Sequence, residues 1–247
     1  MRKAFGKKEL KNAFEKIGEK LEKPVEAFLL GGGAMVFRDQ KNATKDLDLV
    51  FESEEDCKVF SKAAEETGFE KDRGLEAAYR KMMAAGVWRN AGGFCLDLFA
   101  KTVCDALELN EKMAERSTVL GEFGRLTVKM VSNEDVILFK GITERPDDAN
   151  DIAAIVRTAK IDWQTILDEC KTQSRKRAWY GLLYDKPVEI EEKHGIDAPI
   201  AERLSKLDKH ALLKEAYENR VSKGMTRNQA LEDLKKQGFT KKELASL

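Results

Sequence analysis

Two aspartates, Asp46 and Asp48, stand two residues apart in the segment TKDLDLVF, where acidic and apolar residues alternate. This alternation predicts a β-strand whose period of two places both carboxylates on one face and Leu47 and Leu49 on the other. Two such charges repel one another unless a cation or a proton lies between them, and hard divalent cations prefer oxygen ligands. The pair therefore indicates a site for a divalent metal ion, against the simpler alternative of a solvated strand face.

A third carboxylate, that of Asp97, lies in a later alternating segment, GGFCLDLFAKTV, which also predicts a strand. Three carboxylates on adjacent strands can hold two metal ions roughly 3.5 to 4 Å apart, one activating an attacking hydroxyl and the other neutralising a triphosphate. The three aspartates therefore indicate phosphoryl or nucleotidyl transfer with two Mg²⁺ ions. Cys95 shares the face of Asp97, and we interpret it as a small core residue because no histidine partner is indicated.

Three consecutive glycines, Gly31 to Gly33, follow the apolar run VEAFLL and open a predicted helix. Missing side chains at such a turn let backbone N–H groups approach phosphate oxygens. The pattern is not a P-loop, which needs Gly-Lys-Ser/Thr, and it is not a dinucleotide fingerprint, since residue 36 is Val. The turn therefore indicates a phosphate contact, although three glycines alone are more often a plain turn.

The elements that position these residues alternate between helix and strand up to about residue 160. Amphipathic spacing predicts helices near 10–24 and 54–67, and short apolar or alternating runs predict strands. The predicted strands are VEAFLL, TKDLDLVF, GGFCLDLFAKTV and RLTVKMV. Ser132, with Asp135 three residues later, predicts a capped helix, and Asp148 is predicted to cap the next one.

After about residue 160 the period-two alternation ends and only helical spacing continues. We therefore expect an α/β (α+β) domain over residues 1–160, with a small mixed β-sheet flanked by helices, and an all-α domain over 161–247. Near the C-terminus, Thr226 and Thr240 carry Gln229 and Glu243 three residues later, which predicts two capped helices. Gly238 between them predicts a helix stop.

The overall composition argues against several classes of protein. The 44 basic residues are matched by 44 acidic ones, so no net field attracts nucleic acid or anionic lipid. No uncharged apolar run approaches the roughly 20 residues that span a bilayer. The four cysteines have no Cys-x-x-Cys spacing, which argues against a disulfide scaffold and against a structural zinc. We expect a cytoplasmic protein that does not enter a membrane.

The segment FLLGGGAMVFRDQKNATKDLDLVF resembles the opening motif of the nucleotidyltransferase superfamily, which has the DNA polymerase β-like fold. That motif is a Gly-Gly or Gly-Ser turn followed by Asp-x-Asp. CLDLF is similar to the strand that carries the third carboxylate in the family. VSNEDVILFKGITERPDDANDIAAIV is similar to the Lys and Asp-x-x-Asp helices of the abortive-infection toxin and related branches. The resemblance covers roughly residues 20 to 160.

The resemblance implies a role for each matching residue. The catalytic metal ligands would be Asp46, Asp48 and Asp97. Asp97 would also be the carboxylate on the general-base side of the reaction. The nucleoside triphosphate would be contacted by Gly31, Gly32, Gly33, Thr44 and Lys140. Asp148 and Asp151 would support Lys140 or a substrate group. Position 33 departs from the pattern, because many active members have Ser in this turn.

The activity implied is transfer of a nucleoside monophosphate from a nucleoside triphosphate to a hydroxyl of an RNA, such as a tRNA 3′ end, or of a protein. The alternative is a catalytically weak nucleotidyltransferase-like protein that regulates a partner, for instance in a toxin–antitoxin pair. A third possibility is a nucleic-acid-binding regulator that uses the C-terminal helix pair. Lys171 and residues 175–177, followed by Trp179 and Tyr180, mix cationic and stacking side chains as RNA-binding surfaces do, although a solvated helix face explains them more simply.

Overall fold

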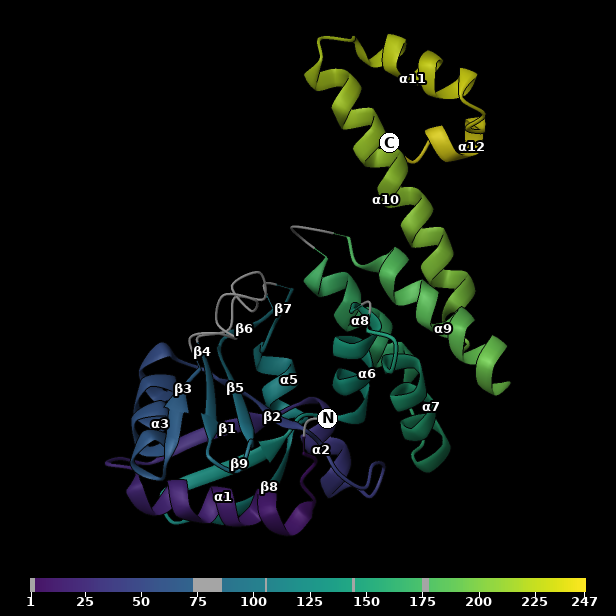
Figure 1. Cartoon of the computed structure of the whole chain (residues 1–247). Coiled ribbons are helices and arrows are strands. Elements are labelled where there is room, and N and C mark those ends of the chain that lie inside the picture. Colours follow the sequence, from purple (N-terminus) through teal and green to yellow (C-terminus); the bar gives the residue numbers. More distant parts are fainter. Residues whose placement is uncertain (1–2, 73–85, 105, 144, 175–177) are drawn as a thin grey trace. The chain divides into compact units, whose positions relative to one another are not determined.

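The computed structural model describes residues 3–72, 86–104, 106–143, 145–174 and 178–247 (Figure 1). The chain forms two compact units, Met1–Ile166 and Leu167–Leu247. The division falls within helix α8 (Trp163–Gln173), a few residues beyond the boundary expected near residue 160. The basic residues 175–177, which we had grouped with a possible RNA-binding surface, lie outside the described residues.

A mixed seven-stranded sheet forms the centre of the first unit, with strand order β3-β4-β5-β2-β1-β9-β8. Its strands are β1 (Val25–Leu29), β2 (Asp46–Phe51), β3 (Phe69–Lys71), β4 (Gly86–Asn90), β5 (Cys95–Ala100), β8 (Thr118–Phe123) and β9 (Leu126–Met130). A separate short hairpin pairs β6 (Thr102–Val103) with β7 (Leu107–Glu108). The α/β class with a mixed sheet is thus confirmed, although the sheet has three strands that the alternation did not predict, β3, β4 and β8.

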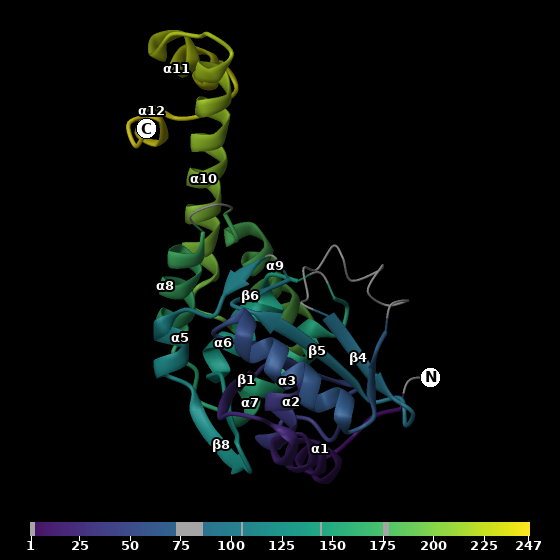
Figure 2. The same cartoon turned by 90° about the vertical axis from the view of Figure 1, so that its left-hand side faces the viewer.

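The described residues of the first unit before α8 form the helices α1 (Lys7–Lys20), α2 (Gly31–Phe37), α3 (Glu54–Glu66), α5 (Glu111–Glu115), α6 (Asn133–Gly141) and α7 (Asp148–Thr158). Of these, α1, α2 and α3 pack against the sheet, whereas α6 packs on α2 and α7. Helices α1 and α3 pack side by side against the strands (Figures 1 and 2). Phe60 of α3 contacts Phe51 of β2 with ring centroids 5.1 Å apart, and Phe14 of α1 contacts Phe123 of β8 at 5.4 Å. These aromatic pairs fix one face of the sheet against its helices.

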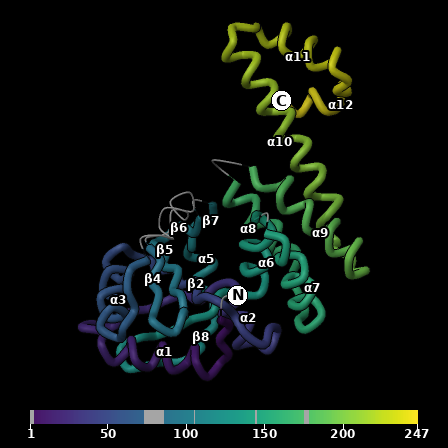
Figure 3. The backbone as a smooth tube through the Cα atoms, in the orientation of Figure 1, coloured from purple at the N-terminus to yellow at the C-terminus, as the bar shows by residue number. Residues whose placement is uncertain are grey.

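The pairing of β2 with β5 decides where the acidic residues meet. The two strands are far apart in sequence but lie side by side and parallel (Figure 3), with Asp48 opposite Asp97 and Asp46 opposite Cys95. Residues that pair across a ladder point to the same face, so the three aspartates share a face. Leu47 is fully buried on the other face, where the apolar half of the alternation was predicted to lie.

The start of α6 agrees with the sequence, whereas the start of α7 does not. Ser132 Oγ accepts a hydrogen bond from the N–H of Asp135 at 3.1 Å, which confirms the predicted cap. The prediction that Asp148 caps α7 is wrong, because Asp147 holds the N-cap position and Asp148 is the first helical residue. The carboxylate of Asp148 is bound by Lys140 and Thr143 instead.

The second unit is helical throughout its described residues. Beyond α8 it contains α9 (Tyr180–His194), α10 (Ala201–Ser222), α11 (Arg227–Lys236) and α12 (Lys241–Leu244). Both predicted capping boxes, Thr226 with Gln229 and Thr240 with Glu243, are present. Gly238 follows the end of α11 with a φ of +99°, a value that glycine adopts without strain. Among the helices described, none has both the length and the apolar character needed to cross a bilayer.

Candidate active site

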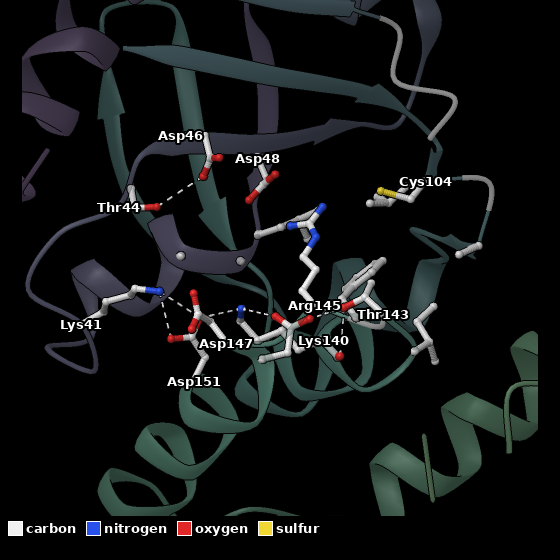
Figure 4. Close-up of a pocket in the computed structure, with 18 of the residues that line it drawn as sticks. Lys41, Thr44, Asp46, Asp48, Cys104, Lys140, Thr143, Arg145, Asp147 and Asp151 are labelled. Carbon is white, nitrogen blue, oxygen red and sulfur yellow. Dashed lines mark hydrogen bonds and ion pairs between the residues drawn. The ribbon is translucent and has the colours of Figure 1, made fainter. Parts of the chain in front are cut away.

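One cavity of the first unit brings together most of the residues that the motifs indicate (Figure 4). Its wall combines the start of α2, the strands β2 and β5, the β6 region and the α6–α7 connection. The charged residues that line it are Asp46, Asp48, Asp147, Asp148, Asp151, Lys41, Lys140 and Arg145. The other lining residues include Gly31, Gly32, Thr44, Phe99, Val103, Cys104, Phe139, Ile142 and Thr143. Carboxylates and cations thus face one another across a single space.

The glycine turn is shaped by the side chains that press against it. Gly31 has a φ of +53°, and a Cβ there would lie 2.5 Å from Asp48 Oδ2. A Cβ on Gly32 would lie 2.5 Å from Thr44 Oγ1. A Cβ on Gly33 would instead meet the core side chains of Leu29 and Leu47, the nearer at 2.7 Å. Gly31 and Gly32 therefore line the cavity, whereas a side chain at position 33 would point into the core.

Asp46 and Asp48 lie beside one another at the cavity wall, and their environment penalises two negative charges (Figure 4). Burial and the neighbouring Asp46 raise the pKa of Asp48 to about 7, against the opposing attraction of Arg145 and Lys140. Folding thus brings together carboxylates that repel one another in the absence of a counter-ion. This is the electrostatic property expected of a cation site.

Asp97 is buried, with 4% of its surface exposed, and it pairs with Asp48 across the β2–β5 ladder. It does not line the cavity. Within the described part of the chain, no group of three or more His, Cys, Asp or Glu side chains is arranged to hold a metal ion. The structure therefore places Asp46 and Asp48 in the cavity wall and Asp97 beside Asp48 on the next strand, outside the lining.

Lys140 is held by two carboxylates from α7. Its Nζ donates to Asp148 Oδ1 at 3.0 Å and to Asp151 Oδ2 at 2.7 Å. Thr143 Oγ1 donates to the second oxygen of Asp148, and Lys41 Nζ donates to both oxygens of Asp151 at 2.9 Å. Burial opposes the charge on Lys140, but the attraction of Asp151 and Asp148 outweighs it and raises the pKa of Lys140. The ammonium is therefore charged and fixed in position.

Thr44 is positioned by the N-terminal segment. It is buried, and its backbone exchanges two hydrogen bonds with Phe5, of 2.7 and 3.0 Å. Its Oγ1 lies 3.5 Å from Asp46 Oδ1. The ring of Phe5 packs on that of Phe94 with centroids 4.4 Å apart. The segment before α1 thus fixes a hydroxyl beside the carboxylates.

Five polar residues of the cavity were not predicted from the sequence: Lys41, Cys104, Thr143, Arg145 and Asp147. The guanidinium of Arg145 lies between Asp48 and Cys104 (Figure 4) and favours the charged form of both groups. Burial and the negative charges of Asp48 and Asp97 raise the pKa of the Cys104 thiol to about 11. Because this thiol stays protonated near neutral pH, it is poorly suited to act as a nucleophile.

The mixed sheet, the glycine turn at the start of α2 and the Asp-x-Asp pair on β2 define a nucleotidyltransferase-type domain. The comparison with protein families agrees, since the chain belongs to the family described as "Nucleotidyltransferase of unknown function (DUF6036)", which matches residues 8–184. The suspected superfamily is thereby confirmed. A search of curated proteins gives no match.

A valine in place of Gly32 tests the phosphate contact that the sequence predicts. The substitution places a branched side chain where Thr44 Oγ1 lies, 2.5 Å from the new Cβ. We expect the Kd for inorganic triphosphate, measured calorimetrically with Mg²⁺ present, to rise about tenfold or more. The affinity for Mg²⁺ alone should change much less, since Asp46 and Asp48 are retained.

The matched control for this variant is Gly6→Val, at the N-cap of α1, where a new Cβ meets no atom closer than 3.5 Å. It should bind triphosphate as the parent does. Unchanged triphosphate affinity in Gly32→Val would remove the glycine turn from the binding site.

Proposed function

We propose that this chain transfers a nucleoside monophosphate from a nucleoside triphosphate to a hydroxyl of an RNA or protein acceptor. The observation that carries the proposal is the cavity in which Asp46 and Asp48 face Lys140 and Arg145. Such an arrangement supplies acidic ligands for cations and cationic groups for phosphate oxygens in one place. Membership of a nucleotidyltransferase family supports the reaction class.

The residues present fit magnesium. Asp46 and Asp48 offer carboxylate oxygens, the donors that Mg²⁺ prefers, and the raised pKa of Asp48 reflects a negative charge in need of a counter-ion. Asp46 and Asp48 would hold the metal, and Asp97 on the neighbouring strand would complete the set. When bound, Mg²⁺ stabilises negative charge on the phosphates and makes an attacking hydroxyl more acidic.

The charges of the cavity support binding of a metal–triphosphate complex rather than a bare triphosphate. Five carboxylates and three cationic side chains line the cavity, so its own formal charge is negative. A triphosphate that enters without cations meets net repulsion. Metal ions that accompany the ligand reverse this balance, and we propose two of them, as in two-metal phosphoryl transfer.

Lys140 would act as a fixed donor to a phosphate oxygen. An ammonium group has three N–H donors, and two of them bind Asp148 and Asp151. The third can donate to a phosphate oxygen without a rearrangement of the side chain. A preorganised donor of this kind stabilises developing charge at low reorganisation cost.

In the proposed reaction the acceptor oxygen attacks the α-phosphorus, and the bond from that phosphorus to the bridging oxygen of the β-phosphate breaks. Pyrophosphate leaves with the bonding electrons. The acceptor proton passes to a carboxylate near the site, for which Asp97 is our candidate because it adjoins Asp48 in the ladder.

A glycine at position 33, where many members of the superfamily have serine, would favour the alternative of a catalytically weak regulatory protein if the serine hydroxyl were needed in the cavity. A side chain at that position would point at Leu29 and Leu47, away from the cavity. The absence of a serine hydroxyl there therefore removes no donor from the cavity wall, and the enzyme is the better supported reading.

The proposal is tested with nucleoside triphosphates labelled at the α- or γ-phosphate, incubated with Mg²⁺, purified protein and cell extract. Relative to extract without the added protein, we expect a macromolecule to acquire additional label from one or more α-labelled nucleotides and from none of the γ-labelled ones. Ribonuclease or protease treatment of the product then identifies the acceptor class. Additional γ-label would instead indicate a kinase, and no additional label from any of the four nucleotides would contradict the proposed transfer.

A further inference from the structure

The cavity has an apolar portion that phosphate chemistry does not use. It is formed by Phe99, Val103, Phe139 and Ile142, which line the same space as the carboxylates and cations. A triphosphate group gains nothing from this surface, because contact with it removes charged oxygens from water without a compensating hydrogen bond. A different part of the ligand must account for it.

The sheet register places this apolar portion beyond the aspartates. Phe99 follows Asp97 by two residues on β5 and pairs with Val50, as Asp97 pairs with Asp48. Phe99 therefore shares the face of the aspartates and lies about 6.6 Å further along the strand, at about 3.3 Å per residue. Val103 lies in β6, shortly after β5 in the chain.

Helix α6 supplies the other apolar side chains. Phe139 and Ile142 are three residues apart and so share a helix face, while Lys140 beside them reaches the acidic network. Phe99, Val103 and Ile142 are buried, with 2%, 7% and 6% of their surface exposed, whereas Phe139 is only half-buried. Among these four lining residues, Phe139 is therefore the most exposed, and it is one of the two that carry an aromatic ring.

Arg145 marks the border between the polar and apolar portions. It acts electrostatically on Asp48 and on Cys104, and its guanidinium lies between them (Figure 4). A ligand that reaches from the carboxylates into the apolar portion passes beside this cation. Such a ligand has a polyanionic end and a flat, largely apolar end.

We infer that the apolar portion is the subsite for the nucleobase of the nucleoside triphosphate, with Phe139 as the ring on which the base stacks. This inference rests on the proposed function, since it assumes that the phosphates lie at the polar end. Every base has a π-face, so stacking on Phe139 contributes affinity for nucleosides in general.

The test compares two ligands on the full-length protein in the presence of Mg²⁺: inorganic triphosphate and a non-hydrolysable nucleoside triphosphate. We expect Phe139→Leu to weaken binding of the nucleotide about tenfold, because stacking on an aromatic side chain typically contributes about 5- to 150-fold in affinity. Inorganic triphosphate has no base, so its affinity should change less than about twofold. Phe139→Tyr, which retains the ring, should bind both ligands nearly as the parent does.

The matched control is Phe37→Leu, since Phe37 is also half-buried and packs on Phe14 without lining the cavity. Equal weakening of both ligands in Phe139→Leu would show a structural role for Phe139 and overturn the inference. Unchanged nucleotide affinity, with or without a loss of transfer to the acceptor, would also overturn it. A parent protein that binds neither ligand would contradict the proposed function itself, which is a distinguishable result.

Discussion

Replacing Asp48 by asparagine is expected to lower nucleotide transfer by roughly 10³-fold or more and to stabilise the metal-free protein at pH 8. The loss of transfer follows from the removal of a proposed metal ligand, since even indirect support of such ligands contributes about 10- to 100-fold. The gain in stability follows from the raised pKa of Asp48, which burial and Asp46 shift to about 7.

The direction of the pH effect follows from proton uptake. The folded protein keeps Asp48 protonated up to about pH 7, whereas the ordinary pKa of the side chain is 3.8. The contribution of this carboxyl to the free energy of unfolding is therefore complete below about pH 4 and decreases as the pH rises to about 7. Above pH 7 the contribution is absent. The whole change amounts to at most about 4 kcal/mol in the free energy of unfolding. Asparagine has the same shape and no charge, so the free energy of unfolding of the variant does not decrease for this reason as the pH rises.

Urea unfolding at pH 5 and pH 8, with a chelator present, measures this effect. The variant should exceed the parent in stability by more at pH 8 than at pH 5. Asp147→Asn is the matched control, because Asp147 lines the same cavity but is exposed and makes no capping hydrogen bond. Parallel pH profiles for the parent and Asp48→Asn would show that this carboxyl ionises normally.

Replacing Lys140 by methionine is expected to destabilise the protein by about 3 to 5 kcal/mol. Lys140 is 12% exposed in its side chain, and its partners Asp148 and Asp151 are 5% and 14% exposed. Removal of the ammonium leaves Asp148 without its cation in surroundings that solvate it poorly. For a chain of this size the melting temperature should fall by roughly 6 to 20 °C, at about 2 to 4 °C per kcal/mol.

Two further variants separate this cause from a loss of packing. Lys41→Met removes the other cation bound to Asp151, but the side chain of Lys41 is 37% exposed, so we expect a loss of about 1 kcal/mol or less. The double variant Lys140→Met with Asp148→Asn removes the unpaired charge and should recover much of the stability. A double variant as unstable as Lys140→Met would mean that the packing of the side chain, and not its charge, is what the fold requires.

Local sequence periodicity was sufficient to predict the strand that carries Asp46 and Asp48 and the face that they share. Asp46 and Asp48 alternate with Leu47 and Leu49, and that pattern is found in a strand wherever one face is buried. Strand β8 was not predicted because it lies at the edge of the sheet, where Val119 is 60% exposed and the ladder has an irregularity. Such a strand has no buried face along its whole length to impose alternation.

The remaining cavity residues depend on tertiary packing, which no local pattern encodes. Lys41 and Arg145 lie in connections between elements, and only the folded chain brings Lys41 to Asp151, 110 residues away. Asp148 was misinterpreted for a related reason. A carboxylate at a helix start usually bonds to the backbone, but here the buried ammonium of Lys140 and the hydroxyl of Thr143 bind it instead.

The parallel pairing of β1 with β9 bears on how the chain is made. Val25 pairs with Leu126 and Leu29 with Met130, so β1 cannot form this pairing until a strand about a hundred residues later has been synthesised. At roughly 5 to 20 residues added per second during translation, this interval lasts on the order of 5 to 20 s. Throughout it the nascent chain carries an apolar strand with one edge unpaired, open to other chains. Until β9 has been synthesised, this strand edge is therefore the part of the growing chain that we expect to be most prone to aggregation.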